Sequence, residues 1–485
     1  MSDDADVRGR ALTGLGWSAR STLFQQVVQF GFGVVLARIL VPTDFGLFAL
    51  MTVFTGFASL FMDFGFSSAI IQRTAIDERY LSSAFWLSLS GGAGVMLVTM
   101  ALAPGLTAFY GQPRLLALTL AFAPVFFIGS VSGVQRAILQ REMNFKKLAV
   151  IENSARVGAS AIAIGMAYAG LGVWSLVGLY LATAVLNSAL LWQFGRWRPS
   201  VRPDRKAMAE LWRFSSRLTG FNVVNYWARN ADNLLIGRFI GVSQLGFYNR
   251  AYTLMLLPSD VATSATDRVM YSALSRLKDD HVRVRRVYLD VVGLLSLALF
   301  PAIVGLFVVC KPFILTVYGP KWLPAVPLLQ ILCLASLMEV LARTTGMIFT
   351  SQGRTDLMFR WGVVSSITAI GSFFIGLPWG VRGITIGFTC WSVLMTYPLF
   401  ATVGKLIDLS MMDVIRAISG ISIASAVMGL ATWIVQVNLP ADWGEPARLG
   451  VGVLVGMATY VIALQIVRPP PWGRFKQLLG DYRRR

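Results

Sequence analysis

The chain has 485 residues, of which 55% are hydrophobic and 14% charged, with a mean hydropathy of +0.64 and a net charge of +19. Soluble domains carry about 25% charged residues, so this composition excludes a soluble enzyme. Apolar runs of about 20 residues instead predict membrane-spanning helices. Because a backbone in lipid must satisfy its own hydrogen bonds, we expect a helical bundle, and the alternating strands of a barrel are not seen in the sequence.

Few side chains in the sequence suit a metal or a nucleic acid. Cys310, Cys333 and Cys390 are scattered along apolar segments, and the single histidine, His281, sits in a basic loop. This pattern predicts no disulfide framework, no metal site and no cofactor. The excess of lysine and arginine is typical of cytoplasmic loops in a membrane protein, so we expect no nucleic-acid partner.

The apolar segments predict fourteen transmembrane helices, with boundaries good to a few residues. The start, "MSDDADVRGR", lacks a basic n-region and a small-residue cleavage site, so no removable signal peptide is expected. The predicted spans lie near residues 14–37, 45–66, 82–104, 115–136, 148–168, 171–194, 210–240, 244–266, 288–310, 323–346, 357–378, 381–403, 413–437 and 446–467.

Charge in the loops predicts the orientation. With a cytoplasmic N-terminus, the outer loops hold only eight of the 43 basic residues, namely Arg38, Arg114, Arg238, Arg250, Lys311, Lys321, Arg382 and Arg448. Cytoplasmic loops of membrane proteins are enriched in lysine and arginine. The bias therefore predicts a multi-pass protein of the cell inner membrane with both termini in the cytoplasm.

An internal repeat relates the two halves. The stretch "LARILVPTDFGLFAL" (36–50) returns as "IGRFIGVSQLGFYNR" (236–250), so that Arg38 matches Arg238 and Gly46 matches Gly246. Looser matches join "FYGQP" (109–113) to "VYGPK" (317–321) and "GLGVWSL" (170–176) to "PWGVRGI" (378–384). Six helices separate the copies, which predicts two parallel lobes of six helices and two extra C-terminal helices. A duplication kept for stability alone is the alternative.

This repeat sets the expected domain organisation. It comprises a cytoplasmic tail (1–13), an N-lobe (14–195), a basic cytoplasmic linker (196–209), a C-lobe (210–404), two extra helices (405–467) and a basic cytoplasmic tail (468–485).

Polar residues recur at helical spacing in repeat-related helices. They line one face of the first and seventh helices, and similar stripes mark the second and eighth. Such groups are costly against lipid, so we expect them to face a wet central cavity. Arginine suits phosphate and carboxylate, and amides and tyrosine suit sugar hydroxyls. The expected substrate-binding residues are Arg20, Arg217, Arg229, Arg268, Gln25, Gln29, Asn222 and Tyr226.

Other charged residues on these helices have expected roles of their own. Asp63, Asp260 and Asp267 are candidates for coupling to protons or sodium, and Pro258 is the candidate hinge. Internal pairing, such as Arg229 with Asp232, is the alternative reading of any single charge. We expect the intrahelical pairs Glu152–Arg156 and Glu339–Arg343 to be structural.

The stretches "GLGWSARSTLFQQVVQFGFGVVLARILVPTDFGLFAL", "GFSSAIIQR" and "LQREMNFKKLAVIE" resemble the bacterial polysaccharide transporters over about residues 10–410. These are the Wzx-type lipid-linked oligosaccharide flippases of the multidrug/oligosaccharidyl-lipid/polysaccharide exporter superfamily. The resemblance implies a V-shaped two-lobed bundle with no catalytic activity. It also implies export of an undecaprenyl-pyrophosphate-linked repeat unit to the outer leaflet, for exopolysaccharide, capsule or O-antigen.

Two other functions stay open at this point. One is a small-molecule or multidrug antiporter of the same superfamily, and the other is a membrane glycosyltransferase or polymerase. The loop "QRTAIDERYLSS" lacks the major-facilitator pattern, and no paired carboxylates occur in the short outer loops. The expected partners are the lipid-linked oligosaccharide, membrane lipid and the polymerase and export machinery.

Overall fold

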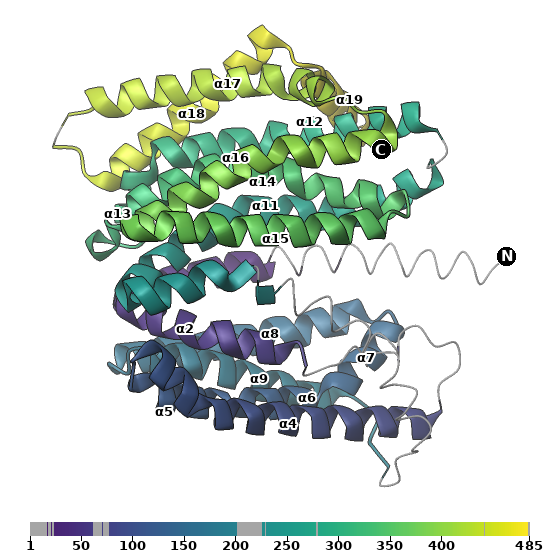
Figure 1. Cartoon of the computed structure of the whole chain (residues 1–485), viewed down its shortest axis with the longest axis vertical. Coiled ribbons are helices and arrows are strands. Elements are labelled where there is room, and N and C mark those ends of the chain that lie inside the picture. Colours follow the sequence, from purple (N-terminus) through teal and green to yellow (C-terminus); the bar gives the residue numbers. More distant parts are fainter. Residues whose placement is uncertain are drawn as a thin grey trace. The chain divides into compact units, whose positions relative to one another are not determined.

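The computed structural model describes residues 24–61, 77–200, 226–227, 229–277, 280–440 and 442–483, together with Trp17, Ser21 and Ile70. Every regular element in these ranges is a helix, and none of them contains a β-strand (Figure 1). The chain divides into two compact units, Met1–Gly246 and Phe247–Arg485, which we call unit 1 and unit 2.

Unit 1 is a helical bundle. Its long helix α4 packs against α5 and α6, and α8 and α9 form a hairpin whose two helices pack along each other. A first helix spans Phe24–Ile39. The others are α2 (Pro42–Ser59), α4 (Glu78–Tyr110), α5 (Arg114–Phe122), α6 (Pro124–Ser130), α7 (Gly133–Arg141), α8 (Phe145–Tyr168), α9 (Trp174–Phe194) and the π-helix η1 (Ile236–Ile240), after which α11 (Val242–Arg276) begins.

Local sequence explains where these helices start and stop. The side chain of Asp77 accepts from the backbone N–H of Tyr80 at 2.8 Å, and that of Asn144 accepts from Lys147 at 3.3 Å, so each caps the helix that follows. Helix α4 ends at Gly111, whose φ of 63° is the left-handed conformation that glycine adopts without strain.

The fourth predicted span is broken. Helices α5 and α6 together are bent by 41° against α7. At the break, the hydroxyl of Ser188 on α9 donates to the carbonyl of Ile128 at 2.8 Å, and the indole N–H of Trp192 donates to the carbonyl of Val131 at 2.9 Å. Carbonyls freed from a helix inside a membrane need partners, and α9 supplies them.

Unit 2 has a core of α12, α14 and α16, with the hairpin of α17 and α18 packed on α12. Its elements after α11 are α12 (His281–Val308), α13 (Cys310–Val317), the 3-10 turn η2 (Pro320–Trp322), α14 (Ala325–Ser351), α15 (Thr355–Gly376), the 3-10 turn η3 (Leu377–Trp379), α16 (Gly380–Ile407), α17 (Met411–Asn438), α18 (Glu445–Val467) and α19 (Pro470–Arg483).

Glycines allow helices of unit 2 to pack closely. A Cβ added at Gly387 of α16 would stand 2.6 Å from the carbonyl oxygen of Ser372 on α15. One added at Gly456 of α18 would stand 3.3 Å from the hydroxyl of Thr432 on α17. Close packing of this kind replaces the hydrophobic effect as the main attraction between helices in lipid.

The helical fold is confirmed, but the count of fourteen spans stays a prediction. Within the described residues, seven helical stretches are long and apolar enough to cross a membrane, or eight with the bent α5–α7 segment. One of the seven, Thr355–Ile407, contains two predicted spans. The predicted first, second and seventh spans are partly outside the described residues. The predicted fifth and eighth spans are helical but are not among these seven.

The internal repeat has a backbone counterpart. Gly111 and Gly319, 208 residues apart, both have positive φ, at 63° and 94°. So do Gly172 and Gly380, also 208 residues apart, at 54° and 68°. Positive φ favours glycine, which explains why glycine occupies these positions in both halves.

Candidate functional site

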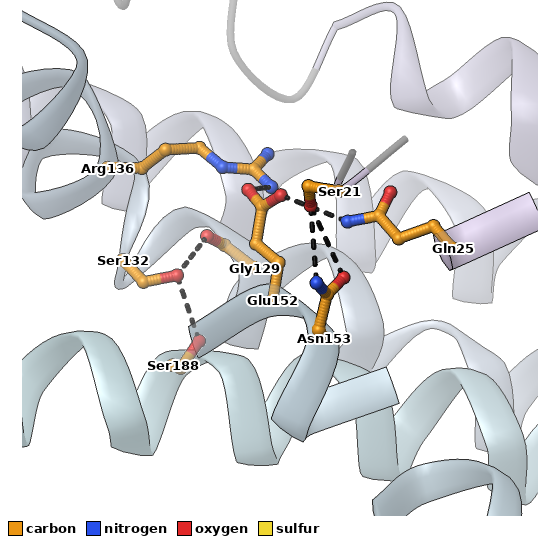
Figure 2. Close-up of polar contacts among 8 residues, drawn as sticks. All are labelled: Ser21, Gln25, Gly129, Ser132, Arg136, Glu152, Asn153 and Ser188. Carbon is orange, nitrogen blue, oxygen red and sulfur yellow. Dashed lines mark hydrogen bonds and ion pairs between the residues drawn. The ribbon is translucent and has the colours of Figure 1, made fainter. Parts of the chain in front are cut away.

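A network of polar side chains joins three helices of unit 1 (Figure 2). Arg136 of α7 forms an ion pair with Glu152 of α8, and the amide of Gln25 in the first helix donates to the same carboxylate at 3.5 Å. Next to it, the amide of Asn153 donates to the hydroxyl of Ser21 at 3.3 Å. The predicted polar face of the first helix therefore contacts charged groups inside unit 1.

The ion pair is only partly shielded from solvent. The side chain of Arg136 is 45% exposed and that of Glu152 is 23% exposed. Two opposite charges at hydrogen-bond distance largely cancel, which lowers the cost of placing them among apolar helices. The guanidinium keeps N–H donors beyond those that meet Glu152, so this site can still bind an anion or a sugar hydroxyl.

The expected intrahelical pair of Glu152 with Arg156 is wrong. Glu152 pairs instead with Arg136, 16 residues earlier, and no ion pair joins it to Arg156 within the described residues. Helices α7 and α8 follow each other in the chain and pack together, and this packing brings Arg136 to Glu152. The expected pair of Glu339 with Arg343 stays a prediction.

The two copies of the repeated motif meet in unit 1 through their glycines. A Cβ added at Gly46 would overlap the backbone carbonyl of Val242, and one added at Gly246 would overlap the carbonyl of Pro42. Positions 42 and 46 correspond to 242 and 246, so the contact is reciprocal, as at a twofold axis. Each glycine is required because any side chain would force the two helices apart.

Tyr226, predicted to bind a glycan, has its hydroxyl engaged within unit 1. It donates to the carbonyl of Val53 on α2 at 2.7 Å and lies 3.1 Å from that of Thr52. The ring of Trp227 packs against Phe57, with ring centres 5.0 Å apart. These contacts hold residues 226–227 of the predicted seventh helix on α2.

The remaining predicted site residues fall in three groups. Gln29 and Arg229 are exposed, and Pro258 is half-buried inside α11, which continues through it. Asp260, Asp267 and Arg268 belong to α11, but their side chains are outside the described residues. The others, Arg20, Arg217, Asn222 and Asp63, lie wholly outside the described residues.

Arg250, predicted near an outer helix end, is held by aromatic rings in unit 2. Its guanidinium carbon lies 4.8 Å from the ring centre of Tyr318 and 5.9 Å from that of Trp322. Tyr318 belongs to the repeated "VYGPK" turn. A cation over aromatic faces is stabilised by their negative charge density, which gives Arg250 a structural role.

Arg136 is the residue that sequence reasoning missed. It lies in the bent fourth span, where no spacing pattern marked it, and its partner is on another helix. The only signal was that a charge beside an apolar span needs a partner. Within the described ranges, no group of three or more His, Cys, Asp or Glu side chains is placed to hold an ion, and the expected absence of a metal stays a prediction.

Comparison with known proteins gives a consistent set of relatives. Residues 35–327 match the model of a family described as "Polysaccharide biosynthesis protein". Lipopolysaccharide biosynthesis protein WzxC of Escherichia coli strain K12 is 28% identical over 398 residues, which are 80% of this chain and 80% of WzxC. Teichuronic acid biosynthesis protein TuaB of Bacillus subtilis strain 168 is 30% identical over 359 residues, which are 73% of this chain and 74% of TuaB.

A solved structure shares the fold. The structure of the lipid II flippase MurJ in its inward closed conformation aligns with this chain with a TM-score of 0.75. The alignment covers 93% of this chain and 98% of the MurJ chain. The two sequences are 14% identical in this alignment, so the likeness concerns the course of the backbone alone.

Proposed function

The chain belongs to the polysaccharide biosynthesis protein family, and from this premise we propose that it is a flippase for an undecaprenyl-pyrophosphate-linked oligosaccharide repeat unit. It would move the head group from the cytoplasmic to the periplasmic leaflet by alternating access, for assembly of a surface polysaccharide. The lipid tail would stay in the bilayer throughout, since only the polar head group has a large cost of crossing hydrocarbon.

The observation that carries this proposal is the Arg136–Glu152–Gln25 network. Charged side chains in a membrane bundle are expensive and mark the paths of polar substrates. Here the network is partly open to solvent and includes an arginine, two amides and a hydroxyl. Arginine binds phosphate with two parallel hydrogen bonds, and amides and hydroxyls exchange hydrogen bonds with sugars.

We extend the same proposal to the predicted residues. Arg20, Arg217, Arg229 and Arg268 would share the pyrophosphate with Arg136, and Gln25, Gln29, Asn222 and Tyr226 would contact the glycan. Asp63, Asp260 or Asp267 would bind the coupling proton or sodium ion, and Pro258 would act as the hinge. A carboxylate suits both ions, because it titrates and is a hard oxygen ligand.

The test is a deletion strain complemented with variants at matched membrane levels. We expect the deletion to accumulate lipid-linked repeat units on the cytoplasmic leaflet and Arg136→Gln to restore little surface polysaccharide. Arg360→Gln, at an exposed arginine of unit 2, is the matched control and should restore it fully. A deletion that accumulates no lipid-linked intermediate, but becomes sensitive to cationic dyes, would instead indicate the antiporter.

A further inference from the structure

A small basic pocket lies where the last spanning helix of unit 2 ends. It has a volume of about 480 Å³, and its lining includes Arg468, Trp472 and Lys476. Both cations are exposed, and no acidic residue belongs to the lining. The pocket therefore carries two positive charges that no carboxylate in its wall offsets.

An indole donor in this pocket has no partner. The Nε1 atom of Trp472 is buried, and within the described residues no acceptor lies within hydrogen-bond distance. A buried N–H without a partner costs free energy that a ligand oxygen would recover. The pocket thus offers two charged donor groups to a ligand, and its lining residue Trp472 has an N–H that still lacks an acceptor within the described residues.

Contacts with neighbouring groups hold the side chains of Lys476 and Arg468 in place. The ammonium of Lys476 lies 4.8 Å from the ring centre of Trp472, over its face. The Nε of Arg468 donates to the carbonyl of Gln465 at 3.1 Å, which leaves the two terminal nitrogens of its guanidinium for a ligand. Positioned donors lose little entropy when they bind, so the pocket is prepared for an anion.

The tail helix α19 that carries the pocket is fixed to the rest of unit 2. Arg474 forms an ion pair with Asp290 of α12. A Cβ added at Gly420 of α17 would stand 2.9 Å from the Cβ of Pro469, and one at Gly293 of α12 would stand 2.5 Å from the Cγ of Pro471. Because Asp290 is taken by Arg474, it does not neutralise the pocket.

The position along the chain indicates which anion would reach it. Helix α18 is apolar enough to span a membrane, and Arg468 directly follows its last residue, Val467. Tryptophan and basic residues at the end of a spanning helix lie at the level of the lipid headgroups. Phosphate groups of membrane lipids are therefore the most concentrated anions beside this pocket.

We propose that this pocket binds the phosphate of an anionic phospholipid headgroup. The lipid would act as a structural ligand that ties α19 to the bilayer surface, separate from the transported cargo. Its phosphate would accept from Arg468 and from the indole of Trp472 and would face the ammonium of Lys476. The inference does not depend on the flippase assignment.

The experiment measures the unfolding temperature of the purified full-length protein in detergent, titrated with phosphatidylglycerol or phosphatidylcholine. We expect phosphatidylglycerol alone to raise it, and the double variant Arg468→Gln/Lys476→Gln to need about 10- to 30-fold more of this lipid. Lys405→Gln, at an exposed lysine elsewhere in unit 2, is the matched control and should respond like the unchanged protein.

Three results would overturn the proposal. The first is equal stabilisation by both lipids, and the second is an unchanged lipid response in the double variant. The third is displacement of the lipid effect by millimolar inorganic phosphate, which would indicate a site for free phosphate. If the double variant does not fold, Trp472→Phe replaces it, because this change removes the indole donor and keeps a ring under Lys476. Its response to phosphatidylglycerol should still be weaker.

Discussion

Units 1 and 2 have glycines of positive φ at matching positions, but the side chains between these glycines differ. Gly111 and Gly172 of unit 1 are followed 208 residues later by Gly319 and Gly380 of unit 2. By this offset Arg136 corresponds to Thr344. In unit 1, Arg136 forms a half-exposed ion pair, whereas in unit 2 the buried hydroxyls of Thr344 and Tyr288 lie 2.8 Å apart.

This difference distinguishes the residues that maintain the fold from the residues that we assign to transport. Turns and close helix contacts depend on backbone geometry, which both copies must keep in order to fold. Charge is expensive in a membrane and, where no structural contact explains it, marks the path of a polar substrate. We therefore expect changes to the charged pair of unit 1 to affect transport, and changes to the neutral pair of unit 2 to affect stability alone.

The largest effect is expected at the glycine crossing of the repeated motif. Gly246→Leu should destabilise the protein by about 3 kcal/mol or more, at or above the usual cost of overpacking, because the new side chain would overlap backbone atoms. Membrane levels and thermal unfolding in detergent measure this. Gly46→Leu should match it, whereas Gly31→Leu is the control, since a Cβ at Gly31 meets nothing within 4 Å. Normal folding of Gly246→Leu would contradict the crossing.

Breaking the ion pair of unit 1 should have the next largest effect. Glu152→Gln leaves the charge of Arg136 without its partner, and we expect a loss of about 1–3 kcal/mol, below the value for fully buried pairs because Arg136 is half exposed. Surface polysaccharide should fall more steeply than protein stability. The exchanged pair Arg136→Glu/Glu152→Arg tests the pairing, and it should recover stability relative to either single change.

The broken fourth span gives a smaller effect. Ser188→Ala removes the donor to the freed carbonyl of Ile128 and should cost about 1 kcal/mol. The control is Ser90→Ala, because the hydroxyl of Ser90 is exposed and bonds only to the carbonyl of Leu87 in its own helix. Equal unfolding temperatures for the two variants would show that α9 does not stabilise the break between α6 and α7.

The neutral pair of unit 2 should give the smallest effect. Tyr288→Phe removes one hydroxyl, while that of Thr344 keeps its bond to the carbonyl of Leu341 at 2.7 Å. Polar contacts between membrane helices average about 0.6 kcal/mol, and we expect a loss of this size. Surface polysaccharide should stay at the level of the unchanged protein, and a clear fall would extend the functional site to unit 2.

The sequence was a good guide to the class of fold and a poorer one to the site. Apolar runs predicted a helical membrane protein, because hydropathy is a local pattern. The break between α6 and α7 was not predicted, since it depends on Ser188 and Trp192 from another helix. Arg136 was missed for the same reason, and Glu152 was assigned to the wrong arginine.

For Gln25, the sequence predicted which face of the first helix carries the side chain. Its spacing with other polar residues predicted an inward-facing stripe, and its amide does contact Glu152 inside unit 1. Helical periodicity identifies the face of a helix that carries polar groups. It does not identify the residue on a distant helix that completes the contact.

The most direct test of the account measures lipid-linked repeat units on each leaflet in deletion cells that carry Glu152→Gln or Tyr288→Phe at equal membrane levels. We expect these units to accumulate on the cytoplasmic leaflet with Glu152→Gln and not with Tyr288→Phe. Equal distributions in the two strains, or accumulation with Tyr288→Phe alone, would contradict a transport role for the charged pair of unit 1.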